Sequence, residues 1–239
     1  MTTLFIDVET LPGQTDCARV QAEADTKPPG TLKKPESIAA WWKEDGPAAI
    51  DTTWRKQALD PAQGELCAIG FATSDTPAQS IVRARVEPEG DFLRRALAVI
   101  DKHLADTAPA LQNDGTPWPY ADDAYVVAHN ADFDLGFVRA RCWGHRIRVP
   151  RWLPKPGARA PRDFGDTMTL FAGYGGRISL DKLCRALGVP SPKADGTSGA
   201  DVLDLWLSGE HGKLASYNAA DVTACAACWW IMQGLEAAA

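Results

Sequence analysis

The sequence lacks any apolar segment long enough to cross a bilayer. Its longest nearly apolar run covers residues 222–232, whereas a spanning helix needs about 20 apolar residues. A secretory leader is also missing, because the chain enters an apolar, strand-like segment at once, without a basic region before it. We therefore expect a soluble protein located in the cytoplasm.

Clusters of cysteine and histidine that would hold zinc are missing too. The chain has six cysteines and four histidines, and only Cys225 and Cys228 are closely spaced, on a predicted helix. A structural zinc site needs four ligands, so two more would have to come from other segments. The spacing favours inert thiols, which usually stay reduced inside cells, over a zinc site. A Gly-x-Ser-x-Gly motif is absent as well, which argues against a serine hydrolase.

The chain does have enough apolar material for a substantial core. Of its 239 residues 45% are hydrophobic, and we expect a single domain over residues 1–239 with an irregular insert at about residues 13–62. Strands followed by alternation and a helical final third indicate a mixed α/β fold. Periodicity predicts strands at 2–9, 65–73, 80–86 and 124–128. It predicts helices at 90–105, 132–145, 166–172, 179–187, 199–208 and 213–236, short helices around Trp41–Trp42 and Trp54, and N-caps at Ser179 and Ser198.

Three short acidic segments carry the chemistry, and the first is Phe5-Ile6-Asp7-Val8-Glu9-Thr10. The period of a strand places Asp7 and Glu9 on one face, opposite the apolar residues that alternate with them. Two charges in such a setting are costly to bury unless a cation or hydrogen bonds compensate them. Hard divalent ions prefer oxygen ligands, so the pair indicates a metal site. The alternative is a pair of edge-strand charges that face water.

The second and third segments place further carboxylates on predicted helices. In His129-Asn130-Ala131-Asp132-Phe133-Asp134, a helix follows an apolar strand, so Asp134 lies in the first helical turn, where a negative charge suits the dipole. In Tyr217-Asn218-Ala219-Ala220-Asp221, the tyrosine and the last aspartate are four residues apart and share a face. Taken alone, Asp134 is equally an exposed acid, Asp132 a helix cap and Tyr217 an interface aromatic. Their joint occurrence favours a site for divalent metal ions.

In this order the segments resemble the motifs of the DEDD superfamily of 3′-5′ exonucleases, which read Asp-x-Glu, Asn-x-x-Phe-Asp and Tyr-x-x-x-Asp. Ser216 stands where the histidine subgroup would place its histidine, so the chain resembles the tyrosine (DEDDy) type. Further segments are similar to stand-alone exonucleases related to the proofreading domain of family B DNA polymerases: Ser179-Leu180-Asp181-Lys182-Leu183, Leu187-Gly188-Val189-Pro190, Asp201-Val202 and Trp206. The resemblance covers nearly the whole chain and is weakest at residues 13–62 and 106–122.

The resemblance implies a ribonuclease H-like fold, with a mixed five-stranded sheet flanked by helices and the first strand at its centre. It also implies two divalent metal ions as cofactors, Mg²⁺ or Mn²⁺, which suit an all-oxygen ligand set better than zinc does. In that arrangement Asp7 bridges both ions, Glu9 and Asp221 complete the site of one, and Asp134 holds the other partly through water. Tyr217 orients the attacking water.

Candidate substrate contacts flank the motifs. Thr10 and Leu11 follow the first motif, and by resemblance Leu11 wedges between terminal bases, although a core position is the alternative. His129 and Asn130 open the second motif. His129 either lines the substrate path or is a structural histidine at a strand end, and Asn130 either contacts substrate or caps the helix that follows.

Charge is unevenly distributed along the chain. Lys and Arg number 25 against 31 Asp and Glu, and this net charge of −6 argues against tight nonspecific binding of nucleic acid by the whole surface. Residues 135–162 nevertheless contain basic residues and two tryptophans but no acid. Such a segment suits a single-stranded track, where phosphates are neutralised and bases stack. The expected contacts are Arg148, Arg151, Trp152 and Lys155, and the alternative is a solvated, proline-rich loop.

The sequence therefore predicts a metal-dependent exonuclease that trims single-stranded or frayed DNA from the 3′ end and releases nucleoside 5′-monophosphates by a two-metal mechanism. An exoribonuclease is one alternative, because the same carboxylates serve both polymers. A module that binds a 3′ end for a polymerase or recombination protein, without cutting it, is the other.

Overall fold

The computed structural model describes residues 2–107, 124–193 and 196–235. The chain divides into two compact units. The larger unit consists of Met1–Glu9 and Leu66–Ala239, and the smaller unit of Thr10–Glu65. The connection that we predict after the helix at 90–105 lies for the most part outside the described residues.

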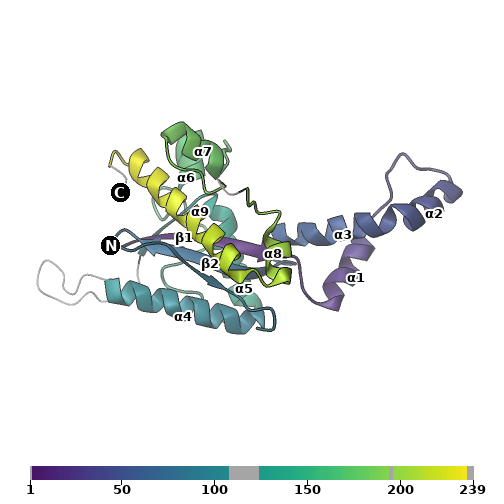
Figure 1. Cartoon of the computed structure of the whole chain (residues 1–239), viewed down its shortest axis with the longest axis horizontal. Coiled ribbons are helices and arrows are strands. Elements are labelled where there is room, and N and C mark those ends of the chain that lie inside the picture. Colours follow the sequence, from purple (N-terminus) through teal and green to yellow (C-terminus); the bar gives the residue numbers. More distant parts are fainter. Residues whose placement is uncertain (1, 108–123, 194–195, 236–239) are drawn as a thin grey trace, which may run out of the picture. The chain divides into compact units, whose positions relative to one another are not determined.

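The larger unit is built on a mixed five-stranded sheet with the strand order β3-β2-β1-β4-β5 (Figure 1). The strands are β1 (Thr2–Leu11), β2 (Glu65–Thr73), β3 (Gln79–Val82), β4 (Ala124–Ala128) and β5 (Gly165–Asp166). β1 runs parallel to β4 and β4 parallel to β5, whereas β2 and β3 are antiparallel. The prediction of a mixed α/β fold with the first strand at the sheet centre is confirmed.

The helices of the larger unit match the six predicted ones, with ends that differ by a few residues. They are α4 (Glu89–Thr107), α5 (Ala131–Gly144), α6 (Thr167–Ala172), α7 (Leu180–Leu187), α8 (Val202–Ser208) and α9 (His211–Met232). The strand predicted at 80–86 is shorter and ends at Val82. No helix in the described ranges is both long enough and apolar enough to span a membrane.

Alternation along β1 gives the sheet two different faces. Leu4, Ile6 and Val8 belong to the core that α4 and α5 complete. Phe5 points to the other face, where it packs with residues of α9 such as Val222. Asp7 shares the parity of Phe5, and so does Glu9, so both carboxylates face α9. In Figure 1, α4 and α9 accordingly lie on opposite sides of the sheet.

Local capping explains where two C-terminal helices begin. Ser179 is the N-cap of α7, and its hydroxyl accepts a hydrogen bond from the backbone N–H of Lys182, as predicted. Ser198 is not the N-cap of α8, because the helix begins later and Asp201 takes that position. The N–H and hydroxyl of Ser198 both donate to the Asp201 carboxylate, so the serine stabilises the turn before the helix.

The smaller unit is helical rather than irregular. It contains α1 (Asp16–Asp25), α2 (Pro35–Glu44), α3 (Gly46–Lys56) and a 3₁₀ turn, η1 (Gln57–Leu59). Trp54 is buried, donates its indole N–H to the carbonyl of Gly13, and carries the Arg19 guanidinium over its ring at 3.4 Å. The predicted short helices around Trp41–Trp42 and Trp54 are present. The expectation of an irregular insert is wrong, since three helices cover most of residues 13–62. Only Ala22 of α1 is buried, so the sequence of this helix has no apolar stripe from which a helix could be predicted.

Candidate metal centre

Three carboxylates converge on the face of the sheet that α9 covers. Asp7 and Glu9 come from β1 and Asp221 from the middle of α9, and one oxygen of each lies within 4.8 Å of the others. Glu9 and Asp221 are buried, and Asp7 is half-buried. The strand period puts the first two on one face, and the packing of α9 over that face adds the third.

These side chains hold more negative charge than a buried site tolerates without a cation. Burial, with the neighbouring carboxylates, raises the pKa of Asp7 and that of Glu9 well above their ordinary values. Burial also raises the pKa of Asp221 to about 6, although a hydrogen bond from Tyr217 opposes the shift. Carboxylate oxygens are the ligands that hard divalent ions prefer, and a bound cation would remove the repulsion. The donor set therefore fits a hard divalent cation.

Asp134 approaches the same region from the first turn of α5. Its Oδ1 accepts a hydrogen bond of 3.0 Å from the backbone N–H of Val8, which ties α5 to β1. Burial raises the pKa of Asp134 to about 8, and its charge in turn raises the pKa of Asp7. Asp134 is thus an electrostatic neighbour of the cluster but not one of the three residues within 4.8 Å. Its role as ligand of a second ion stays a prediction.

Tyr217 lies one turn before Asp221 on α9 and is hydrogen-bonded to that carboxylate. Burial, followed by the charge of Glu9, raises the pKa of Tyr217. The phenol therefore stays protonated and donates a hydrogen bond to the Asp221 carboxylate. This leaves the lone pairs of the phenolic oxygen as acceptors. The structure places the two side chains together, as their spacing of four residues predicts.

Asn218 is a further residue of the site, which the sequence analysis does not identify. Its side chain is fully buried, and its Nδ2 donates to Asp7 Oδ2 at 2.7 Å and to the Asp7 carbonyl oxygen at 3.3 Å. Its Oδ1 accepts a 2.6 Å hydrogen bond from the hydroxyl of Ser80 on β3. The amide therefore fixes the orientation of the Asp7 carboxylate. A polar residue beside Tyr217 inside the third motif is the only sequence signal for it.

Lys193 is a second residue missed by the sequence analysis. Its positive charge lowers the pKa of both Glu9 and Asp221, against the larger effect of burial. The side chain is exposed and follows α7 in the chain. It contributes positive charge close to the carboxylates, and nothing in its sequence setting predicts this position.

The two predicted contacts that open the second motif are engaged within the protein. The ring nitrogens of His129 lie 2.9 Å from Thr167 Oγ1 and 3.0 Å from the carbonyl oxygen of Ile178. Burial lowers the pKa of His129, so the ring is neutral at neutral pH. Asn130 has a left-handed backbone, with φ of 63°, and its N–H donates to Asp166 Oδ1 at 3.0 Å. Asn130 occupies the N-cap position of α5 without a capping bond from its side chain, and Asp132 lies inside the helix.

Thr10 and Leu11 belong to the smaller unit, so the structure does not place them against the carboxylates. The hydroxyl of Thr10 donates to the carbonyl of Ala58 at 2.6 Å, and Leu11 is fully buried. A substrate contact by either residue stays a prediction.

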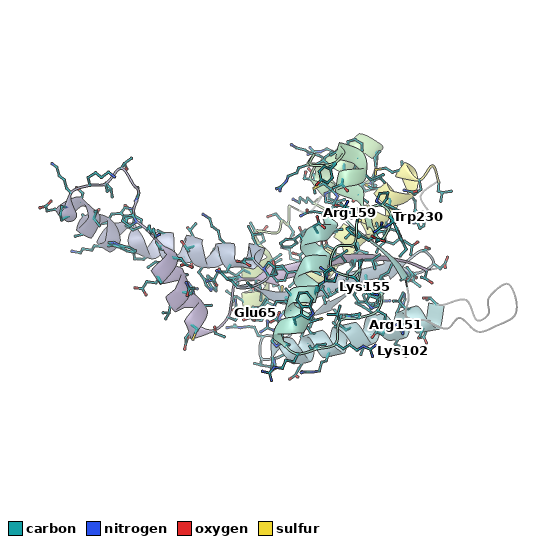
Figure 2. All side chains as sticks on the ribbon, turned by 180° about the vertical axis from the view of Figure 1, so that it is seen from behind. Glu65, Lys102, Arg151, Lys155, Arg159 and Trp230 are labelled. Carbon is teal, nitrogen blue, oxygen red and sulfur yellow. The ribbon has the colours of Figure 1, made fainter. Side chains whose placement is uncertain are left out.

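Much of the basic segment after α5 has a structural role. Trp152 is 2% exposed and donates its indole N–H to Asp101 of α4 at 2.9 Å. A buried indole has no face free for a base, so Trp152 does not enter the proposed substrate path. Arg141, which is partly buried, forms an ion pair with the buried Glu89. Arg148, Arg151 and Lys155 are exposed. Figure 2 shows Arg151 near Lys102 in the C-terminal part of α4, next to Asp101, which accepts the hydrogen bond from Trp152.

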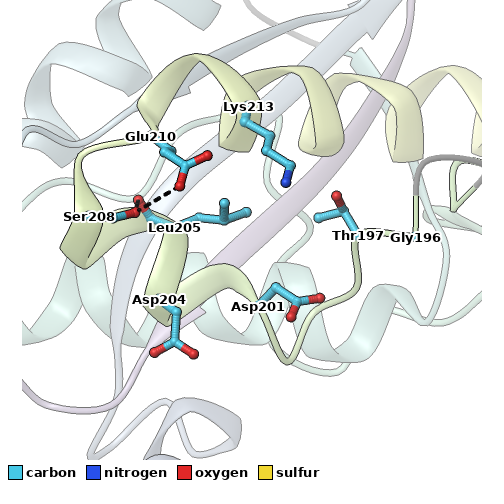
Figure 3. A pocket seen from close by; sticks show the side chains of 8 residues that line it. All are labelled: Gly196, Thr197, Asp201, Asp204, Leu205, Ser208, Glu210 and Lys213. Carbon is cyan, nitrogen blue, oxygen red and sulfur yellow. Dashed lines mark hydrogen bonds between the residues drawn. The ribbon is translucent and has the colours of Figure 1, made fainter.

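A pocket lies beside the first turns of α9 (Figure 3). Lys213 lines it and points into it, and this residue lies four positions before Tyr217 on the same helix face. The other lining residues are Gly196, Thr197, Asp201, Asp204, Leu205, Ser208 and Glu210. Three carboxylates against one ammonium group make the pocket unsuitable for a phosphate.

Comparisons with known proteins give a family match and matches among solved structures. Residues 120–237 match the model of a family described as a predicted 3′-5′ exonuclease related to the exonuclease domain of PolB. Among solved structures, the chain is similar to the family B DNA polymerase from the hyperthermophilic archaeon Pyrobaculum calidifontis, with 14% sequence identity and a TM-score of 0.55. The match covers 94% of this chain and 23% of the polymerase chain. No curated protein matches the sequence.

Residues 120–237 are thus similar to a predicted exonuclease family related to PolB, and the whole chain has a mixed α/β fold of the ribonuclease H-like kind. The family match includes the second and third motifs, whereas Asp7 and Glu9 lie before it. The likeness to the polymerase supports the fold alone.

Proposed function

We propose that the protein is a metal-dependent 3′-5′ exonuclease that hydrolyses the terminal phosphodiester bond of single-stranded or frayed DNA and releases nucleoside 5′-monophosphates. The observation that carries the proposal is the group of Asp7, Glu9 and Asp221 within 4.8 Å, with Tyr217 bonded to Asp221. Asp221 and Tyr217 of this group, and Asp134 nearby, fall within residues 120–237, which match the exonuclease family.

Each residue of the site has a distinct task in this proposal. Two Mg²⁺ or Mn²⁺ ions, when bound, would supply positive charge to the attacking and leaving oxygens. Asp7, Glu9 and Asp221 would hold them, with Asp134 as the further ligand. Tyr217 commits its proton to Asp221, so its oxygen accepts a hydrogen bond from a water molecule and orients that water.

The decisive experiment follows the fate of a label at the 5′ end. We expect 5′-labelled single-stranded DNA to shorten progressively with Mg²⁺ or Mn²⁺, and a 3′-phosphate to inhibit because it adds bulk and negative charge at the strand end next to the carboxylates. Full activity in excess EDTA would contradict metal dependence, and immediate release of the labelled nucleotide would contradict the 3′-5′ direction. Faster cleavage of RNA would favour an exoribonuclease. Binding of 3′ ends without cleavage under either metal would favour an accessory module.

A matched pair of variants tests the assignment of the carboxylates. Asp7→Ala should abolish cleavage by removing a ligand, while the metal-free fold stays intact or becomes slightly more stable because repulsion is relieved. Asp132→Asn removes an exposed acid two residues from Asp134 and should leave cleavage unchanged. Equal losses in both variants would point to a general effect of charge rather than to ligation.

A further inference from the structure

The segment between the first residue of α6 and the start of α7 exposes large apolar side chains. Leu170 and Phe171 on α6 are 42% and 45% exposed, and Tyr174 in the turn that follows is fully exposed. Exposed apolar groups that gather on one short segment mark interaction surfaces. Together with the exposed Arg177 we call these residues the aromatic turn: Leu170, Phe171, Tyr174 and Arg177.

One histidine fixes both ends of this segment at the edge of the sheet where the second motif begins. His129 contacts Thr167, the first residue of α6, and the carbonyl of Ile178, just before α7. The N-cap of α6, Asp166, also accepts the N–H of Asn130. The aromatic turn therefore projects from the carboxyl ends of β4 and β5, the same edge from which Asp134 reaches the carboxylates. In Figure 1, α6 and α7 lie together beside α9.

Charge along this part of the chain is positive, in contrast to the whole protein. Residues 167–193 contain four basic residues (Arg177, Lys182, Arg185 and Lys193) and one acid (Asp181), a net charge of 4 − 1 = +3 in a chain of net −6. Asp181 is paired with Arg185. Lys193, at the end of this stretch, acts electrostatically on Glu9 and Asp221. Positive charge thus extends from the aromatic turn to the metal centre.

The basic segment at 148–162 is less well placed for the same task. It precedes β5 in the chain, so it enters the sheet from the amino ends of the parallel strands, whereas α6 follows β5 at the carboxyl ends. Its central tryptophan, Trp152, is buried against α4. The aromatic turn instead combines exposed rings with nearby cations, which is the combination that single strands require.

Building on the proposed exonuclease function, we propose that the aromatic turn is the binding surface for the single strand whose 3′ end lies at the carboxylates. Bases stack on Tyr174 and Phe171, and Arg177 and Lys182 contact backbone phosphates. Stacking on a flat ring tolerates every base, so this surface would bind strands without sequence preference. The surface accepts a nucleic acid rather than a protein segment because its charge is opposite to that of the phosphates.

Binding of a labelled single-stranded oligodeoxynucleotide, measured by fluorescence anisotropy with Ca²⁺ in place of Mg²⁺, tests this proposal. Tyr174→Ala should weaken binding about 5- to 100-fold, the range expected for the loss of one stacked base. The double change Arg177→Ser and Lys182→Ser should lower the slope of log affinity against log salt by about 0.7 per lost phosphate contact. Trp143→Ala, which removes a ring that is 59% exposed on α5, is the matched control and should bind like wild type.

Each outcome bears on one of the two proposals. Tyr174 is exposed, so its replacement should leave the melting temperature and the cleavage of a dinucleotide, which spans only the metal centre, unchanged. If the Tyr174 variant binds with wild-type affinity and the Arg177/Lys182 variant keeps the wild-type salt slope, the proposal that the aromatic turn binds the strand is overturned. An equal loss in the Trp143 variant would overturn it as well, in favour of the α5 side. Absence of any cleavage by the wild type would overturn the exonuclease function, and the binding comparison would still decide the surface.

Discussion

At the scale of single residues, Asn218 determines how Asp7 presents its carboxylate. The amide holds one oxygen of Asp7 at 2.7 Å and is itself held by Ser80. We expect Asn218→Ala to weaken Mn²⁺ binding about 10- to 100-fold, as is typical when a partner of a metal ligand is lost. Isothermal titration calorimetry checks this, with the melting temperature as a test of folding.

Ser80→Ala is the graded control for Asn218→Ala. It removes the bond to Asn218 Oδ1 but leaves the bond to Asp7, so its effect on Mn²⁺ affinity should be clearly smaller. Wild-type affinity in the folded Asn218 variant would refute a role in positioning the ligand.

Tyr217 is expected to serve turnover rather than metal binding. Its phenol donates a hydrogen bond to Asp221, and Tyr217 is not one of the three residues whose oxygens could hold an ion. Tyr217→Phe should therefore slow turnover about 10- to 1,000-fold, the range of positioning and acid–base effects, with nearly unchanged Mn²⁺ affinity. Loss of Mn²⁺ binding in a calorimetric titration of this variant would contradict that assignment.

At the scale of elements, the site depends on how closely α9 approaches β2. A Cβ atom at Gly70 would lie 2.6 Å from Asn218 Oδ1 and 2.8 Å from Val222 Cγ2. Gly70→Ala should therefore push α9 outwards, cost about 1–3 kcal/mol of stability and weaken Mn²⁺ binding through Asn218. Chemical denaturation and calorimetry measure the two effects.

Gly165→Ala separates overpacking from damage to the site. A Cβ atom there would lie 2.8 Å from the Trp229 ring, so it also crowds α9, but it does not approach Asn218. We expect a similar loss of stability with a smaller loss of Mn²⁺ affinity. If both glycine variants lose affinity equally, the position of α9 as a whole, and not the amide of Asn218, sets the geometry of the centre.

At the scale of the whole molecule, the buried carboxylates predict that the metal-free protein loses stability as pH rises. Folding raises the pKa of Asp221 from 3.8 to about 6 and that of Asp134 from 3.8 to about 8. The folded state therefore binds more protons than the unfolded state between about pH 4 and pH 8, and the free energy of unfolding falls over that range. Thermal denaturation in EDTA at a series of pH values measures the decline.

Divalent metal ions should reverse this pH dependence. An ion that binds only the folded state stabilises it, and it binds best where the carboxylates are ionised. The rise in melting temperature on adding Mn²⁺ should therefore be larger at pH 8 than at pH 5, by about 2–4 °C for each kcal/mol of difference. Asp134→Asn should flatten the upper part of the EDTA curve. A melting temperature in EDTA that rises from pH 5 to pH 8 would contradict the burial of these acids.

The sequence by itself determined the features that depend on local geometry. The strand period placed Asp7 and Glu9 opposite Ile6 and Val8, and the helical period placed Tyr217 beside Asp221. The N-cap at Ser179 and the bounds of β4 follow from the same local rules. These features could be predicted because backbone geometry alone fixes which side chains share a face.

Only the tertiary structure decided which groups are buried and what they contact. It showed the hydrogen bond from Asn218 to Asp7 and the burial of Trp152 against α4. It also showed the contact of His129 with the carbonyl of Ile178 after the aromatic turn, and the helix α1, which has no apolar stripe in its sequence. Asn218 and Asp7, for example, are 211 residues apart in the chain. Contacts over such separations depend on how whole elements pack, and the packing of α9 onto the sheet is not encoded in any local spacing.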